Sequence, residues 1–122
     1  MEIAEEKRFD VSVIAPVFNE AESITPLCNA VREVLDAQGL VWELILVNDG
    51  SVDQSGSILD EVATGDKRVK IIHFRRNYGQ TAAMMAGIDF ASGDIIFKMV
   101  EYFRHWGNVE RRIVLRDYQI EP

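Results

Sequence analysis

Near its start the chain contains the apolar segment Val11-Ser12-Val13-Ile14-Ala15-Pro16-Val17-Phe18. Its density of branched apolar residues is typical of a strand that is buried on both faces of a parallel sheet. Directly after it, apolar residues recur at helical spacing from Ile24 to Leu35, and Gly39 is placed to end that helix. The start of the chain therefore predicts a buried strand followed by a helix with one apolar face.

The same cycle occurs twice more along the chain. Strands are predicted at 42–47 and 69–74, helices at 58–65 and 80–91, and a fourth strand at 95–97. Strands that alternate with helices need right-handed crossovers and form a mostly parallel sheet. The sequence thus predicts an α/β fold with helices on both faces of the sheet.

The composition fits one folded domain. The 122 residues are 48% hydrophobic and 27% charged, which is enough apolar side chain for one small core. Lys and Arg number 13 against 20 Asp and Glu, so the formal net charge is -7, and no basic block is present that would neutralise phosphates. We therefore expect no nucleic-acid partner. Because no apolar run reaches the ~20 residues of a membrane-spanning helix, we expect a soluble, cytoplasmic chain.

Polar residues follow each of the first three predicted strands. In an open parallel sheet, the ligand crevice lies beyond the carboxyl ends of the strands. The segments there are Pro16 to Glu20, Asn48 to Asp53 and Arg75 to Gln80. Carboxylates after two strands and a basic, amide-bearing loop after the third form the set that a nucleotide needs, namely acceptors for base and ribose and cations for phosphate.

Each of these segments also has a structural interpretation. Asn19 and Glu20 would cap the first helix, Asp49-Gly50-Ser51 would be an ordinary turn, and Asn77-Tyr78-Gly79 would be a loop around a left-handed residue. No Gly-x-Gly-x-x-Gly or Walker loop occurs, which disfavours dehydrogenase and kinase functions.

Three ordered motifs at the right spacing resemble the inverting family 2 glycosyltransferases, over about residues 9 to 99. The motifs are Val13 to Glu20, Val47 to Asp53, and Arg76 to Gln80 followed by Ala91 to Asp94. The likeness is closest to the branch that transfers a sugar to polyprenyl phosphate, such as the dolichol-phosphate mannosyltransferases. It implies a Rossmann-like GT-A fold, a UDP- or GDP-sugar donor, a polyprenyl phosphate acceptor and association with a membrane.

The resemblance also implies which residues bind the donor. In such enzymes the position of Pro16 and the Asn19-Glu20 pair lie against the nucleoside, and the position of Asp49 reaches the base or ribose. The loop equivalent to Arg75 to Gln80 faces the base and the phosphates. The implied set for nucleotide-diphospho-sugar binding is Pro16, Phe18, Asn19, Glu20, Asp49, Arg75, Asn77, Gly79 and Gln80. None of these is assigned a catalytic role.

The chain departs from the family after the fourth strand. There the family has an Asp-x-Asp motif that holds a divalent Mg²⁺ or Mn²⁺ on the diphosphate, whereas Val100-Glu101-Tyr102 follow here. With one carboxylate in that segment, we assign no metal ligand. Family members continue through an acceptor-binding half, so we interpret residues 1–99 as the donor-binding half of a truncated glycosyltransferase domain. Residues 100–122 form a divergent tail, with a strand-like segment at 109–120.

Two functions from different classes are left open. The first is a glycosyltransferase that uses a nucleotide-sugar donor. The second is an inactive fragment that keeps the fold, or a weak nucleotide site, and self-associates as a homo-oligomer. Met84, Met85 and Phe90 are predicted to pack in the core. His73 and His105 have no partners at ligand or triad spacing, and we interpret both as structural.

Overall fold

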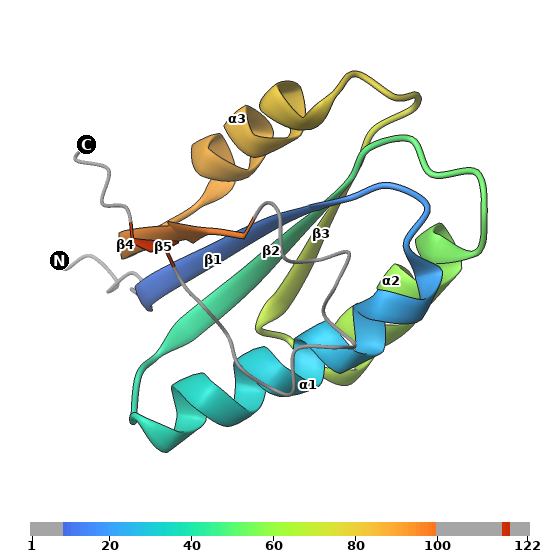
Figure 1. Ribbon diagram of the computed structural model, residues 1–122. Coiled ribbons are helices and arrows are strands. Elements are labelled where there is room, and N and C mark those ends of the chain that lie inside the picture. The colour runs from blue at the N-terminus through green and yellow to red at the C-terminus, as the bar shows by residue number, and fades with distance from the viewer. Residues whose placement is uncertain (1–8, 100–115, 118–122) are drawn as a thin grey trace, which may run out of the picture.

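The computed structural model describes residues 9–99 and 116–117 and has a central sheet between helices (Figure 1). The four parallel strands are β1 (Phe9–Val17), β2 (Trp42–Asn48), β3 (Val69–His73) and β4 (Gly93–Lys98). The short β5 (Arg116–Asp117) pairs with β4 in the antiparallel sense, and the strand order is β3-β2-β1-β4-β5. The predicted strand-like segment at 109–120 lies outside the described residues except for β5.

The helices cover the two faces of the sheet as the sequence predicts. Helices α1 (Ala21–Ala37) and α2 (Ser55–Gly65) lie together on one face, and α3 (Gln80–Phe90) lies on the other (Figure 1). The α/β class and the mostly parallel sheet are thus confirmed. Within the described residues, no helix has the length and apolar character needed to cross a membrane.

The first strand is longer at its start than predicted and ends one residue earlier. Asp10 extends it, because its backbone N–H donates to the carbonyl of Val41 at 2.7 Å and its carboxylate accepts the N–H of Val41 at 2.8 Å. At the other end β1 stops at Val17, so Phe18 belongs to the following loop and is exposed. The apolar run alone does not reveal either change, because both depend on contacts with the loops.

Two apolar clusters enclose β1 from opposite sides. Val11, Val13, Ala15 and Val17 pack with the residues of α1 and α2, while Ile14 packs with residues of α3. All five side chains are buried. The prediction that this strand is buried on both faces is therefore confirmed.

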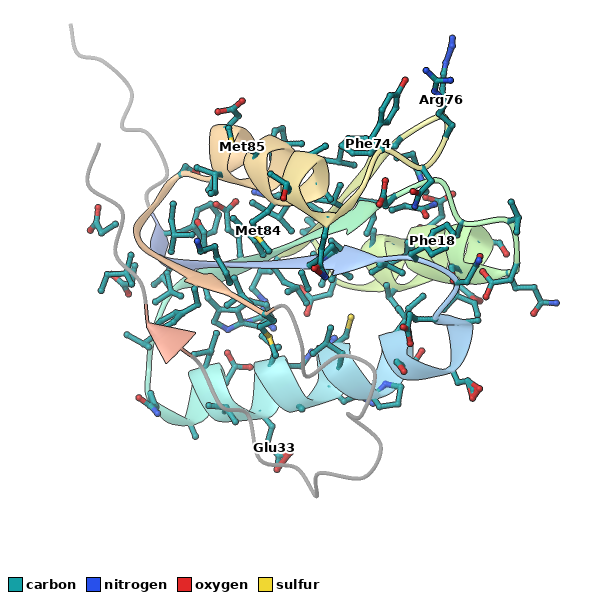
Figure 2. The ribbon with its side chains drawn as sticks, turned by 45° about the horizontal axis from the view of Figure 1, so that its top comes forward. Phe18, Glu33, Phe74, Arg76, Met84 and Met85 are labelled. Atoms are coloured by element: carbon teal, nitrogen blue, oxygen red, sulfur yellow. The ribbon has the colours of Figure 1, made fainter. Side chains whose placement is uncertain are left out.

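Helix α3 approaches the sheet through its small residues. A Cβ atom on Gly87 would lie 2.4 Å from Cγ2 of Ile14, and Ala83 is buried at the same interface. Met84 packs toward the sheet, but Met85 lies on the outer face of the helix (Figure 2). Met85 is 57% exposed and Phe90 is 54% exposed, so the prediction that they pack in the core is wrong. Ala83 and Gly87 take the closest approach to the sheet, while Met85 and Phe90 lie outside.

A buried carboxylate joins all four parallel strands near their amino ends. Glu43 of β2 is 1% exposed and accepts hydrogen bonds from the Ser12 hydroxyl at 2.6 Å, the Ser92 N–H at 2.8 Å and the Lys70 ammonium at 2.9 Å. Ser12 in turn accepts the N–H of Gly93 at 2.8 Å. Burial alone would raise the pKa of Glu43, but these hydrogen bonds outweigh it and lower that pKa.

Replacing this carboxylate by an amide should destabilise the fold. In Glu43→Gln the Lys70 ammonium loses its charged partner, and the new NH₂ group faces donors that need an acceptor. We expect the free energy of unfolding, measured with urea at neutral pH, to fall by about 1–3 kcal/mol. Glu33→Gln, on the exposed face of α1 (Figure 2), is the matched control and should change it by less than about 0.5 kcal/mol.

The same pair of variants gives a pH test. Because the pKa of Glu43 is lowered on folding, its charged form stabilises the protein above the unfolded pKa, and that contribution is lost as the pH falls through the folded value. The deficit of Glu43→Gln relative to the parent chain should therefore shrink in acid. A deficit that stays constant down to acid pH would mean that the charge of Glu43 does not stabilise the sheet.

Candidate functional site

The candidate site lies at the carboxyl ends of the parallel strands, where β1 and β4 are neighbours. Strand β1 leads through α1 to β2 on one side, whereas β4 is reached through α3 across the opposite face, so this is the point where the strand order reverses. The carbonyl of Ile14 accepts the N–H of Met99 at 2.8 Å. The next residue of β1 that faces β4 is Pro16, which has no N–H to donate. The ladder to β4 therefore ends here, while β1 continues to pair with β2 up to Val17.

Three loops follow the carboxyl ends of β1, β2 and β3, and hydrogen bonds tie them to one another. They are the β1–α1 loop (residues 18–20), the β2–α2 loop (residues 49–54) and the β3–α3 loop (residues 74–79). Asn19, with a left-handed φ of 51°, connects the first two loops. Its N–H donates to the Ser51 hydroxyl at 2.9 Å, and its side-chain oxygen accepts the N–H of Val52 at 2.9 Å. Asn19 thus holds the two loops in a fixed relation.

Asp53 supports the same junction from the β2–α2 loop. Its carboxylate accepts the N–H of Ser55 at 2.8 Å, and the hydroxyl of Ser55 accepts the N–H of Glu20 at 3.1 Å. Hydrogen bonds from the hydroxyl and N–H of Ser55, with a further one from the N–H of Ala21, lower the pKa of Asp53. Glu20 occupies the N-cap position of α1 but makes no side-chain cap bond. The structural interpretation of Asn19 and Glu20 as side-chain caps is therefore wrong.

Asp49 joins the β2–α2 loop to the β3–α3 loop. It is 4% exposed, and its carboxylate accepts the N–H of Tyr78 at 2.7 Å, the N–H of Gly79 at 3.0 Å and the side-chain NH₂ of Asn77 at 3.1 Å. The Asn77 NH₂ also lies 3.1 Å from the carbonyl of Asp49. Three predicted site residues, Asp49, Asn77 and Gly79, are thus in direct contact, and their contacts are with one another.

Gly50 lets the two loops approach at backbone level. Its φ is 72°, and a Cβ atom there would lie 2.3 Å from the carbonyl carbon of Arg76 and 2.4 Å from the nitrogen of Asn77. A larger residue would have to displace the backbone of the β3–α3 loop. This contact explains why glycine follows Asp49 in the sequence.

The exposed residues of the β3–α3 loop form an aromatic and cationic surface. The guanidinium of Arg76 lies 4.9 Å from the centre of the Tyr78 ring, and the edge of Tyr78 meets Phe74 at 5.6 Å between centroids. Arg76 extends away from the body of the protein (Figure 2), and Tyr78 is 55% exposed. The remaining predicted residues, Phe18, Arg75 and Gln80, are also exposed. The donor-binding set predicted from the sequence omits Arg76 and Tyr78, although both lie inside the motif.

The metal position of the family falls partly outside the described residues. Strand β4 ends at Lys98, and Val100-Glu101-Tyr102 are not described. Within residues 9–99 and 116–117, no group of three or more His, Cys, Asp or Glu side chains is placed to hold a metal ion. A segment with one carboxylate does not fit the pair of hard oxygen ligands that Mg²⁺ or Mn²⁺ needs on a diphosphate.

Comparison with known proteins identifies the family. Residues 12–99 match the sequence pattern of glycosyl transferase family 2. The chain belongs to that family. All of the strand-end loops described above lie inside the matched range, so the candidate site belongs to the family 2 part of the chain.

Family 2 relatives include enzymes that act on a lipid carrier. The chain is 40% identical over 86 residues to a bactoprenol glucosyl transferase of Shigella phage SfV, and 39% identical over 90 residues to an undecaprenyl-phosphate 4-deoxy-4-formamido-L-arabinose transferase of Salmonella paratyphi B. These matches cover 70% and 73% of this chain but 28% of each relative. The chain therefore spans little more than a quarter of the length of these family 2 proteins.

A solved glycosyltransferase structure confirms the GT-A type of fold. The mannosyltransferase PcManGT from Pyrobaculum calidifontis, crystallised with GDP-Man and Mn²⁺, superposes with a TM-score of 0.64 at 22% identity. The match covers 77% of this chain and 28% of that protein. The predicted Rossmann-like architecture is thus the one that this family 2 chain adopts.

The tight contact at Gly50 leads to a prediction with a matched control. Gly39 has a similar φ of 68°, but no atom lies within 4 Å of the position that a Cβ would take, so Gly39→Ala should lower the free energy of unfolding by about 1–2 kcal/mol for the left-handed backbone alone. Gly50→Ala should lower it by about 1–3 kcal/mol more, because the loop backbone must move. Urea unfolding measures both, and NMR amide shifts of residues 76–79 should change only in Gly50→Ala. Equal losses would contradict the close approach.

Proposed function

We propose that this chain binds the nucleoside diphosphate part of a UDP- or GDP-sugar at the carboxyl edge of the sheet, against the loops that follow β1, β2 and β3. The observation that carries the proposal is the hydrogen-bonded junction of the three loops at the carboxyl edge of the sheet. Such a junction fixes the site before a ligand arrives, which reduces the entropy lost on binding. The family membership supports the same function.

The exposed groups around the junction suit the parts of a nucleotide. Arg75 and Arg76 supply cations for the diphosphate, and guanidinium groups pair well with phosphate oxygens. Phe18 and Tyr78 offer exposed aromatic faces for a base. We propose that Asn19, Asp49 and Asn77 form the frame of the site, because their side chains bind the neighbouring loops, and that Glu20 and Gln80 complete the polar rim.

We propose sugar transfer to a polyprenyl phosphate as the reaction of the longer family 2 domain. The names of the relatives, bactoprenol and undecaprenyl-phosphate transferases, support that acceptor class. Homologous positions for the acceptor would lie in the part of the relatives that this chain does not match. The donor site is therefore the half of the reaction that can be tested with these residues.

Calorimetry with UDP and GDP tests the donor site. We expect dissociation constants in the high micromolar range, or about -5 to -6 kcal/mol of binding free energy. Arg75→Ala should weaken the binding about tenfold, because a charged hydrogen bond to phosphate is lost. Lys67→Ala, in the turn before β3 at the opposite edge of the sheet, removes the same charge and should leave the affinity unchanged.

The outcomes separate the two functions that the sequence leaves open. Equal weakening by Arg75→Ala and Lys67→Ala would mean that the net charge of the protein, and not the proposed site, attracts the nucleotide. No binding of either nucleotide would favour the second hypothesis, an inactive fragment that keeps only the fold. Self-association through an exposed apolar edge of the sheet stays a prediction.

The residues that follow β4 lead to a prediction about metal binding. Since one carboxylate stands where the family has two, adding Mg²⁺ or Mn²⁺ should change the dissociation constant of UDP or GDP by less than about threefold, which is below about 1 kcal/mol. The comparison must allow for the complex that the ion forms with free nucleotide. A strong Mn²⁺ requirement would mean that Glu101 or another acid has taken the role of the missing motif.

A further inference from the structure

A series of hydrogen bonds leads from the outer surface of α2 to the β1–α1 loop. His73 Nε2 lies 2.8 Å from Asp60 Oδ1, and His73 Nδ1 lies 3.0 Å from Asn48 Nδ2. Asn48 Oδ1 accepts the N–H of Ser51 at 3.0 Å, and the hydroxyl of Ser51 accepts the N–H of Asn19 at 2.9 Å. His73 is therefore connected to both of the loops that Asn19 holds together.

The hydrogen-bond donors in this series fix where the His73 ring carries its proton. A backbone N–H can only donate, so the oxygen of the Asn48 amide must face Ser51 and its NH₂ must face His73. The NH₂ can only donate as well, so Nδ1 of His73 must be an acceptor. The ring is therefore neutral, with its proton on Nε2, and that proton is donated to Asp60.

We propose that His73 is a positioning residue for the nucleotide loops, and that a proton on its Nδ1 releases them. The inference rests on the proposed nucleotide site. A proton on Nδ1 would bring two donors face to face, because the NH₂ of Asn48 lies 3.0 Å away. The Asn48 amide then has to turn over, which points its NH₂ at the N–H of Ser51. The N–H of Ser51 then loses its acceptor on Asn48, whose side chain is buried.

Asp60 does not remove this effect. It comes from α2 and pairs with the Nε2 side of the ring, while Asn48 comes from β2 and pairs with the Nδ1 side. Protonation converts the contact with Asp60 into an ion pair, which keeps the ring in place. Both side chains are exposed, so water weakens that ion pair. Protonation of His73 therefore changes the hydrogen bonds of Asn48 and of the β2–α2 loop that follows it.

NMR of the chain without nucleotide tests the mechanism directly. Between about pH 8 and about pH 5, the range in which histidine side chains change their charge, the amide signals of Ser51 and Asn19 should move together with the ring ¹⁵N signals of His73. At the high end of the range, the ring should carry its proton on Nε2. His105→Asn is the control, and it should leave this titration unchanged. A proton on Nδ1 of the neutral ring, or a Ser51 amide that does not follow the ring, would overturn the proposal.

Two variants of His73 separate positioning from simple packing. In His73→Asn the side-chain oxygen, bonded to Cγ as Nδ1 is, can accept from Asn48 but takes up no proton in this range. His73→Gln carries its amide farther out, near Asp60, and leaves the NH₂ of Asn48 without an acceptor. Calorimetry with UDP and GDP at about pH 8 and about pH 5 compares them with the parent chain.

The nucleotide phosphate also takes up a proton in this pH range, and His73→Asn measures that contribution alone. At the lower pH, the parent chain should lose about tenfold more affinity than His73→Asn, corresponding to one hydrogen bond. His73→Gln should bind weakly at both pH values. Equal pH dependence in the parent chain and His73→Asn would overturn the proposal. If neither nucleotide binds at any pH, the proposed function fails, and the NMR titration still decides the role of His73.

Discussion

The burial of β1 on both faces is the constraint on which the rest of the structure depends. Its side chains contact the helices on either side, and its backbone pairs with β2 on one edge and β4 on the other. The pairing with β2 runs to the end of the strand, but the pairing with β4 stops before Pro16. Within the described residues, the carboxyl end of β1 is thus paired on one side only, next to the loops that follow the strands.

The loops at the carboxyl edge of the sheet are held by their own polar side chains. Asn19, Asp49 and Asn77, which the sequence alone would assign to a ligand, make their hydrogen bonds to neighbouring loops. Exposed loops with several Gly and Asn residues would otherwise sample many backbone states. The buried carboxylate of Asp49 orders three successive residues of the β3–α3 loop at once. Under the proposed function, recognition is then left to the side chains that extend outward from this frame.

The sequence predicts the fold well, because its information is local. Strand and helix periodicity locates the elements of the described chain, and alternating strands and helices require a parallel sheet. Prediction from the sequence fails where the role of a residue depends on partners that are distant in the chain. Glu43 looks like one polar residue in an apolar strand, and its partners Ser12, Lys70 and Ser92 lie 27 to 49 residues away. His73 likewise gains its significance from Asn48 and Asp60, which no spacing rule connects to it. The outward position of Met85 follows from Gly87, whose close contact with Ile14 is invisible in the sequence.

The contact between Gly50 and the β3–α3 loop has a consequence for how the family can diversify. Gly50 touches the backbone of Arg76 and Asn77 and not the side chain of Arg76, which extends away from the protein. The close approach at Gly50 therefore does not depend on the side chain at position 76. Exchanging that side chain removes its contact with the Tyr78 ring but leaves the approach at Gly50 in place. Under the proposed function, residue 76 is thus a position at which the charge offered to a nucleotide can be changed while the backbone contact at Gly50 is kept.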